Sequence, residues 1–534
     1  MSSSTSNEYS LPTTTSPLNV PASANRWFIP LFALVVVGGL FYIFHALALD
    51  LESASAVPWL LLGVALLIAL GFEFVNGFHD TANAVATVIY TRALPAHAAV
   101  LWSGLFNFLG VLASSGAVAY GIVALLPVEL IMQVGSSAGL AMVFSLLLAA
   151  ILWNIGTWYF GLPNSSSHTL IGSIMGVGLA NQFLAPADAA ASGVDWSQAY
   201  KIGLALLVSP LIGFIGAAVL LVLMKTVIRN KDLMKSPEDN TPPPTMIRGL
   251  LILTCTGVSF AHGSNDGQKG MGLIMLILIG LVPTAFALNR TPDAEYMDSF
   301  RSASTQFEQT LDRYAGSTAP ADNVREEVVR AIETHQWTPS TTASLAQFVG
   351  DTRSEVEHFD SLAQVPNTLV TNLRNDIYLS GQAAALLPQQ SGLTISDSDQ
   401  QVLDNFKGQV NAATQFIPVW VKVAVALALG LGTMVGWKRI VRTVGERIGK
   451  THMTYGQGAS AELVTMATIG AADHLGLPAS TTHVLSSGVA GSMTAHGSGL
   501  QWSTIRNMLM AWVLTLPASI AIAFVLYVAM RAVF

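Results

Sequence analysis

The chain is poor in charged residues and almost free of cysteine. Only 11% of its 534 residues are Asp, Glu, Lys or Arg, whereas a soluble domain carries about 25%. This scarcity excludes an ordinary soluble globular protein. The single cysteine, Cys255, lies within an apolar run. A disulfide framework within the chain and a cysteine-based metal site are therefore excluded.

Signatures of other protein classes are also missing. No Gly-x4-Gly-Lys-Ser/Thr loop occurs, so we do not expect ATP-driven pumping within this chain. The serine-rich turns described below place Ser near His but lack the Gly-x-Ser-x-Gly elbow of a hydrolase, so we expect no enzyme. The first 25 residues are rich in Ser, Thr and Pro and lack the basic segment of a cleaved signal peptide. We predict a disordered tail over 1–26 and a retained transmembrane helix over 27–49.

Hydrophobic residues make up 52% of the chain, and its mean hydropathy is +0.53. A membrane-spanning helix needs about 20 mostly apolar residues. Several of the apolar segments are short or interrupted by Gly and Pro, which predicts half-helices or re-entrant hairpins. The sequence therefore predicts an all-α polytopic membrane protein with the lipid bilayer as a partner. No nucleic-acid partner is expected. The apolar segments lie near 27–49, 59–78, 98–126, 139–160, 164–181, 203–224, 246–264, 270–288, 417–436, 458–475, 480–495 and 506–530.

The negative charge of the chain is concentrated in one hydrophilic segment. Residues 289–416 contain 17 acidic and 8 basic residues, a balance of −9, and the rest of the chain is left at +2. The net charge therefore says nothing about the membrane core. Within this acidic insert, Asp322–Glu333 and 397–413 have the pattern of amphipathic helices. We predict a small helical extramembrane domain.

Two clusters of Lys and Arg indicate the orientation. They lie at 225–248 and 438–450, and short basic loops face the cytoplasm. An even number of crossings must then separate them, and 417–436 is one crossing. The segment 249–288 must supply an odd number, which we predict to be one interrupted crossing with a re-entrant portion. This places the insert 289–416 on the outer face.

Two polar turns of similar sequence interrupt the apolar segments. Gly161-Leu-Pro-Asn-Ser-Ser-Ser-His168 is echoed by Gly476-Leu-Pro-Ala-Ser-Thr-Thr-His483. Hydroxyl groups and a helix-breaking proline are unfavourable in hydrocarbon unless they line a cavity. Their occurrence at corresponding positions predicts a duplicated transporter architecture with a polar site between the halves.

A second pair of polar segments supports the duplication. Asn76-Gly-Phe-His-Asp80 can be aligned with His262-Gly-Ser-Asn-Asp266, which superposes the first glycines and the two aspartates. Asp80 lies 88 residues before the histidine of the first turn, and Asp266 lies 217 residues before that of the second. The difference of 129 residues nearly equals the 128 residues of the insert.

We therefore predict two homologous halves, one of which carries the insert. The predicted organisation is a first transmembrane repeat over 59–225, a cytoplasmic linker over 226–245, a second repeat formed by 246–288 and 417–534, and the outer-face insert over 289–416.

The segments Asn76–Thr87 and Ser259–Gly270, with the two polar turns, resemble the paired signatures of the Pit family of inorganic phosphate transporters. The flanking Phe106–Gly110 and Ser209–Gly213 fit the same family, and the resemblance is closest to its bacterial low-affinity members. It implies two inverted-topology repeats with broken helices and re-entrant Ser/Thr hairpins, and a phosphate site near the midplane. It also implies symport with H⁺ or Na⁺, transport of a phosphate complex with Mg²⁺ or another divalent metal, a homodimer, and a place in the bacterial inner membrane.

The charges of the signatures support cation coupling without reference to the family. An ionised aspartate at bilayer depth costs roughly 2.5–3.5 kcal/mol on insertion scales. Asp80 and Asp266 with a hydrogen-phosphate dianion would carry −4, and Lys269 returns only +1. Such an excess is untenable in a low dielectric. Protons, cations or a metal must therefore bind together with the anion, and each then raises the affinity for the other.

The candidate site residues fall into two chemical groups. Asp80 and Asp266 are predicted to bind the coupling cation or metal and to carry exchangeable protons, with Asn83 and Glu462 as further cation candidates. Phosphate oxygens need donors, which hydroxyl groups and the backbone N–H groups at helix N-termini supply. The predicted substrate ligands are Ser165, Ser166, Ser167, Ser480, Thr481, Thr482, Asn76, Asn265 and Lys269.

Structural interpretations of several of these residues remain open. Serine and threonine in membrane helices often donate to the carbonyl four residues earlier. Lys269 is three residues after Asp266, a spacing suited to an ion pair. His168 and His483 are interpreted as hydrogen-bonding caps that fix the turns. Glu73 and Asp473 are weaker candidates for the site.

Two alternative functions remain open. Sulfate or another oxyanion fits hydroxyl ligands as well, although an acceptor carboxylate favours phosphate, since sulfate has no proton to donate. An anion channel is the second alternative. Ionisable residues at duplicated broken helices favour alternating access over an open pore.

Overall fold

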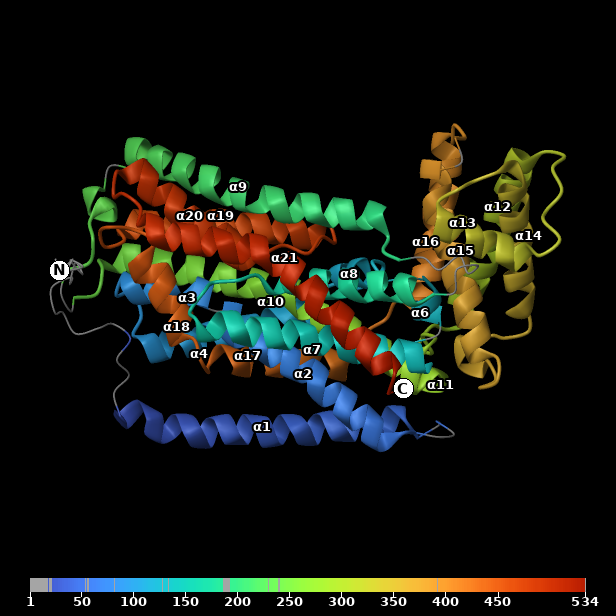
Figure 1. The fold of residues 1–534 in the computed structure, drawn as a ribbon, viewed down its shortest axis with the longest axis horizontal. Helices are drawn as coiled ribbons and strands as arrows, with labels where there is room; N and C mark the ends of the chain where they lie inside the picture. The colour runs from blue at the N-terminus through green and yellow to red at the C-terminus, as the bar shows by residue number, and fades with distance from the viewer. Residues whose placement is uncertain are drawn as a thin grey trace, which may run out of the picture.

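The computed structural model of the chain is an elongated helical bundle with a second group of helices at one end (Figure 1). No β-strand occurs in the part of the chain that it describes, and the predicted all-α fold is confirmed. Most of the predicted disordered tail lies outside this part. The structure describes residue 18 and residues 22–52, 54, 57–80, 82–126, 128–132, 134–185, 193–228, 230–238, 241–390 and 392–533.

The bundle contains the long apolar helices. Among the described residues, seven helical stretches are long and apolar enough to cross a membrane, and the number rises to eight if the bent pair α16–α17 forms one span. The helices of the bundle and its connections are α1 (Ala22–Asp50), α2 (Trp59–Asp80), α3 (Ala82–Tyr90), α4 (Ala96–Ala113), α5 (Ala117–Val123), α6 (Val128–Met132), α7 (Ser137–Tyr159), α8 (Ser166–Leu184), α9 (Trp196–Val227), η1 (Lys231–Met234), α10 (Thr245–Leu281), α11 (Pro283–Phe286), α17 (Val419–Thr433), α18 (Lys438–Arg442), η3 (Thr443–Arg447), α19 (Tyr455–His474), α20 (Thr481–His496) and α21 (Trp502–Arg531).

The acidic insert forms the group of helices at one end of the bundle (Figure 1). Apolar faces pack inside it, for example the rings of Phe307 and Phe406, whose centroids lie 4.6 Å apart. Two of its helices, α13 and α16, correspond to the predicted amphipathic segments. The insert contains α12 (Ala294–Ala315), α13 (Val324–Thr334), α14 (Pro339–Glu355), η2 (Leu362–Gln364), α15 (Val370–Gln390) and α16 (Asp397–Thr414).

The two basic loops meet at the end of the bundle that is remote from the insert. The backbone N–H of Tyr455 donates to the carbonyl of Lys235 at 3.2 Å, and the Ser236 hydroxyl donates to the carbonyl of His452 at 3.3 Å. Figure 1 shows α18, within the second basic cluster, at the end opposite α12–α16. The two basic loops therefore share one face and the insert lies at the other. The assignment of the insert to the outer face stays a prediction.

The predicted interruption of the second signature is wrong. Residues Thr245–Leu281 form one unbroken helix, α10, and Asp266 lies inside it. By length and composition, this one continuous helix could cross a membrane once, and the predicted odd number of crossings stays a prediction. The first signature ends α2 at Asp80 and resumes with α3 at Ala82, but Thr81 between them lies outside the described residues.

Close packing, and not a helix break, explains the glycines of the second signature. A Cβ atom at Gly263 would overlap the carbonyl oxygen of Asn107 in α4, and a Cβ atom at Gly110 would overlap that of Phe260 in α10. Each helix thus presses a glycine against the backbone of the other. A larger residue at either position would force α4 and α10 apart.

The same arrangement recurs at the first signature. A Cβ atom at Gly77 in α2 would overlap the carbonyl oxygen of Leu429 in α17, and one at Gly432 would overlap that of Phe74. Gly77 and Gly263 are the glycines that the sequence alignment superposed. This recurrence agrees with two homologous halves, while their inverted topology stays a prediction.

The two polar turns adopt the same local structure. Each joins two helices, α7 to α8 and α19 to α20, and each begins with a glycine of positive φ, 67° at Gly161 and 66° at Gly476. The side chains of Ser165 and Ser480 then accept a hydrogen bond from the backbone N–H three residues later, as N-caps of α8 and α20. Both helices therefore start inside the protein with polar groups around their N-termini.

We expect Gly263→Ala to lower the midpoint of thermal unfolding in detergent, because the added methyl group must displace α4. Overpacking of this kind costs roughly 1–3 kcal/mol. Gly249→Ala, in the same helix with nothing within 4 Å of the new Cβ, is the matched control and should leave the midpoint unchanged or slightly raised. Equal midpoints for the two variants would contradict the close-packing account.

The orientation can be tested by cysteine labelling, since the lone Cys255 is buried and should not react. Ser317→Cys, exposed in the insert, should react in intact cells with a membrane-impermeant maleimide. Ser236→Cys, exposed in the first basic loop, should react only after permeabilisation. The reverse pattern would place the insert in the cytoplasm.

Candidate functional site

The structure brings the two signature aspartates together around one hydroxyl group. The Ser166 Oγ donates to Asp80 Oδ2 at 2.7 Å and lies 3.3 Å from Asp266 Oδ2. Asp80 comes from the first signature, Asp266 from the second, and Ser166 from the first polar turn. All three side chains are buried, with exposed fractions of 3% or less. Residues far apart in the sequence thus form one polar centre.

A single cation is built into this centre. Lys269 Nζ lies 2.7 Å from Asp266 Oδ2 and 3.2 Å from Ser166 Oγ, and its side chain is fully buried. The ion pair suggested by the i,i+3 spacing is therefore present. Because Lys269 Nζ also lies close to Ser166 Oγ, it would be adjacent to an anion bound at that hydroxyl. Two carboxylates and one ammonium leave a formal charge of −1 when the neighbouring imidazoles are neutral.

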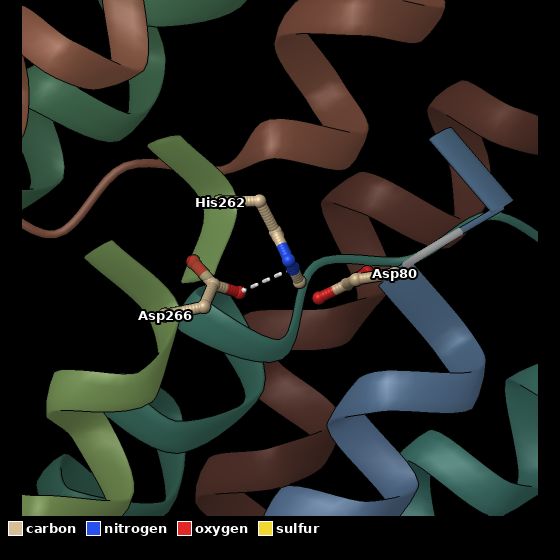
Figure 2. Close-up of side chains that lie close together, drawn as sticks. All are labelled: Asp80, His262 and Asp266. Atoms are coloured by element: carbon tan, nitrogen blue, oxygen red, sulfur yellow. Dashed lines mark ion pairs between the residues drawn. The ribbon is translucent and has the colours of Figure 1, made fainter. Parts of the chain in front are cut away.

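One histidine, His262, lies beside the two aspartates. His262 Nε2 lies 3.3 Å from Asp266 Oδ2, and its Nδ1 lies 2.8 Å from the Asn107 side-chain oxygen. Figure 2 shows the carboxylate of Asp80 directed toward His262 and Asp266. One ligand atom from each of these three residues lies within 4.8 Å of the others. Two carboxylates and an imidazole at this spacing can hold a divalent cation.

The hydroxyl groups of the turns divide into two kinds. Ser165 and Ser480 cap their helices, and the Ser167 hydroxyl donates to the carbonyl of Ala479 at 2.7 Å, so these three hold the turns in place. The Thr482 hydroxyl donates to Asp80 Oδ1, and with Ser166 it reaches the aspartates. The Thr481 hydroxyl is buried without a hydrogen-bond partner in the described chain. Its O–H group is therefore available to donate to a substrate oxygen.

The predicted asparagine ligands are positioned differently from one another. Asn265 donates to the carbonyl of Leu477 at 3.0 Å and accepts from the backbone N–H of Ala479 at 3.2 Å. Both ends of its side-chain amide are thus used to hold the second turn. Asn76 lies 3.4 Å from Glu73 Oε2, and its own side-chain oxygen is buried without a partner among the described residues. The side chain of Asn83 falls outside the described residues.

Asp473 provides a further attachment between α10 and the second hairpin. It accepts a hydrogen bond from Ser264 at 2.6 Å and one from the Gln268 side-chain amide, also at 2.6 Å. Ser264 and Gln268 flank Asp266 on α10. Together with Asn265, they fasten the α19–α20 turn to the helix that carries the second aspartate.

Comparison with known proteins decides the family. The profile of the phosphate transporter family (PHO4) matches residues 76–523, which contain both signatures and both turns. The chain belongs to the phosphate transporter family. Phosphate is the substrate of this family, whose members are transporters and not enzymes, and the resemblance stated from the sequence is confirmed.

Several bacterial transporters align with most of this chain. The low-affinity inorganic phosphate transporters PitB and PitA of Escherichia coli K12 are each 41% identical over 485 residues, covering 88% of this chain and 96% of theirs. A low-affinity inorganic phosphate transporter of Buchnera aphidicola from Acyrthosiphon pisum is 40% identical over 479 residues, with the same coverage. A solved structure described as the sodium-dependent phosphate transporter aligns with a TM-score of 0.49 and 19% identity, over 89% of this chain and 100% of that one.

Glu462 does not join the two signature aspartates in this structure. Its buried carboxylate accepts hydrogen bonds from Thr87 and Thr254. Thr254 precedes Asp266 by 12 residues on α10, which is roughly 18 Å along the helix axis. Glu462 is therefore a separate buried carboxylate, and its predicted role in cation binding stays a prediction.

The interpretation of His168 and His483 as side-chain caps is wrong. Their backbone N–H groups, not their rings, bond to the capping serines. The rings lie against each other with centroids 4.5 Å apart, and His483 stacks on Trp512 at 4.1 Å. They join the two hairpins by ring contacts, because both turns end at the same level of the bundle.

Sequence reasoning omitted His262 and His79 from the site. His79 Nδ1 lies 3.3 Å from Asp80, and its Nε2 lies 3.2 Å from the Thr157 hydroxyl. The i,i+4 spacing of His262 and Asp266 on one helix was the available signal for His262. It was missed because the second signature was predicted to interrupt the helix.

The bridging position of Ser166 leads to a direct test. We expect Ser166→Ala to reduce phosphate uptake by about tenfold or more, because it removes a charge-assisted hydrogen bond and leaves two carboxylates in contact with no donor between them. Ser173→Ala is the matched control, since Ser173 lies buried on the same helix and donates only to the carbonyl of Thr169. Equal uptake by both variants, at equal amounts in the membrane, would remove Ser166 from the site.

Proposed function

We propose that the protein imports inorganic phosphate by cation-coupled symport. The observation that carries the proposal is the position of Ser166, whose hydroxyl lies between Asp80 and Asp266 with Lys269 beside it. Donors for an anion and carboxylates for a cation occupy the same buried centre. The low-affinity phosphate transporters of E. coli and Buchnera support phosphate as the substrate.

The electrostatics of this centre favour a metal–phosphate complex with a proton. The two aspartates and Lys269 leave −1, and a bare hydrogen-phosphate dianion would raise this to −3. A divalent cation bound with the dianion adds no net charge, so −1 remains, and one proton neutralises it. Each bound ion therefore removes the electrostatic penalty of the next, which couples their binding.

Each group of residues then has a defined task. Asp80, Asp266 and His262 hold the divalent cation, while Ser166, Thr481, Thr482 and Lys269 donate to phosphate oxygens. The N-termini of α8 and α20 add the positive ends of two helix dipoles. Because these groups come from both halves of the chain, movement of one half against the other can expose the site alternately to the two sides.

Phosphate fits this centre better than sulfate does. Hydrogen phosphate carries a proton that a carboxylate can accept, whereas sulfate has only acceptor oxygens at neutral pH. The carboxylates of Asp80 and Asp266 would repel sulfate. A sulfate transporter on the same fold is therefore the alternative that the substrate test must exclude.

We propose the bacterial inner membrane as the location, in keeping with the bacterial relatives and with the several apolar helices. The insert is then on the periplasmic or outer side. The predicted homodimer has no support beyond the family resemblance and stays a prediction.

Uptake into proteoliposomes tests the proposal. The purified protein should accumulate labelled phosphate when an inward proton gradient and Mg²⁺ or Mn²⁺ are supplied, and chelation of divalent ions should abolish uptake. Na⁺ should not replace them, and sulfate should not be accumulated. Uptake driven by Na⁺ alone, or unchanged by chelation, would contradict the metal–proton assignment. Uptake of sulfate in place of phosphate would overturn the substrate.

The two aspartates can be tested separately from the substrate. Asp80→Asn and Asp266→Asn should each reduce coupled uptake to the level of empty vesicles, because each removes a carboxylate from the cation site. Asp312→Asn, an exposed change of the same kind in the insert, should transport normally. Near-normal uptake by both site variants would refute the cation-site assignment.

A further inference from the structure

A cavity lies between the insert and the membrane domain. Its volume is about 380 Å³, and its walls come from α5, α10, α15 and the segment that joins α16 to α17. Polar side chains on the wall are those of Tyr120, Arg374, Tyr378, Gln382, Thr414 and Gln415.

Arg374 is the only fixed charge among the side chains that line this cavity. It is buried, with an exposed fraction of 5%. One guanidinium nitrogen donates to Asn375 Oδ1 at 3.1 Å, and the guanidinium carbon lies 4.8 Å from the ring centroid of Tyr378. Its Nε has no hydrogen-bond partner in the described chain. Burial lowers the pKa of Arg374, but a guanidinium stays charged at neutral pH.

Within the described chain, Arg374 also lacks the carboxylate partner that most of the other arginines of the insert have. Five of the seven arginines in the insert form ion pairs with carboxylates, as Arg313 does with Asp399 at 2.6 Å. No carboxylate in the described chain lies within 4.0 Å of Arg374, although the insert has more than twice as many acidic as basic residues. A buried cation without a counter-ion is destabilising, so its retention points to an anion that binds there.

The cavity extends from Arg374 toward the transport site. Its wall includes Gly272 of α10 and Gly476 of the second polar turn. Gly272 follows Lys269 by three residues, roughly 4.5 Å along the helix axis, and Gly476 precedes the capping Ser480 by four residues. An anion at Arg374 would therefore stand on the insert side of the site formed by the two aspartates. Arg374 also lines a neighbouring cavity of about 340 Å³.

We infer that Arg374 and this cavity form a second oxyanion site, which captures phosphate from the insert side before it reaches the two aspartates. The inference rests on the phosphate import proposed above and on the outer-face placement of the insert. The bidentate fork of the guanidinium suits a phosphate group, and Gln382 and Gln415 offer further amide donors. The site offsets locally the repulsion that an insert of charge −9 exerts on an anion.

A lipid headgroup carries the same phosphate chemistry, but the position of the cavity favours the free ion. The wall is made by the insert on one side and by α5 and α10 on the other, and α10 is the helix that carries Asp266 and Lys269. An anion bound here can continue to the site, whereas the acyl chains of a lipid would hold its headgroup at the bilayer.

Initial uptake rates at varied phosphate concentration test this inference. Arg374→Gln should raise the KM for phosphate about tenfold, as expected for loss of one charge-assisted hydrogen bond, with little change in maximal rate. Arg374→Lys keeps the charge and should lie closer to the wild type. Arg313→Gln removes the same charge from an exposed, paired position of the insert and should leave KM unchanged.

The same vesicles separate phosphate capture from a structural role and from lipid binding. A purely structural role for Arg374 would lower the maximal rate and the thermal stability of both Arg374 variants without a selective change in KM, and that result would overturn the inference. An effect of Arg374→Gln seen only in vesicles with anionic phosphatidylglycerol, and absent in phosphatidylcholine, would assign Arg374 to a lipid headgroup and would also overturn it.

A measurement that does not depend on transport separates this inference from the proposed function. In the Asp80→Asn, Asp266→Asn double variant, inorganic phosphate should protect Arg374 from modification by phenylglyoxal, measured by mass spectrometry, and should not protect Arg313. Loss of transport with protection retained would leave the second site standing. Modification of Arg374 at the same rate with and without phosphate, together with an unchanged KM in Arg374→Gln, would refute it.

Discussion

The contact between two buried carboxylates through one serine hydroxyl is the interaction on which the rest of the structure depends. Ser166 donates to Asp80 and lies beside Asp266, and Lys269 is paired with Asp266. Such a centre is not stable alone in a low dielectric. It has to be enclosed by polar groups from both halves of the chain, and its remaining negative charge makes it dependent on cations. The charge of this buried centre therefore explains both its enclosure by the fold and its coupling to cations.

Close helix packing makes this enclosure possible. Gly77 and Gly432 let α2 meet α17 at backbone distance, and Gly110 and Gly263 do the same for α4 and α10. Without a hydrophobic driving force between helices in lipid, small residues at the contact are the usual route to tight association. The glycines of the signatures therefore serve the site indirectly, by setting the distance between the helices that carry its aspartates.

Much of this could be predicted from the sequence, because composition and duplication are visible in it. The apolar segments, the two turns, and the association of Asp80 with Asp266 followed from hydropathy and spacing. The continuity of α10 did not follow, since glycine is read as a helix breaker unless a neighbouring backbone is known to press against it. The separation of Glu462 from the aspartates, the ring contact between His168 and His483, and the lack of a carboxylate beside Arg374 in the described chain likewise depend on tertiary neighbours that no local pattern specifies.

The attachments of the second turn are unequal to those of the first. Asn265, Ser264 and Gln268 bind the α19–α20 turn to α10 through its backbone and Asp473. The first turn is joined to the second by the hydrogen bond from Ser167 to Ala479 and by the contact between the rings of His168 and His483. A relative displacement of the two halves would shear the structure along a plane between the hairpins, where these contacts and those of Ser166 with Asp266 and Lys269 have to exchange. On one side of that plane, the second aspartate and its hairpin travel as one rigid block.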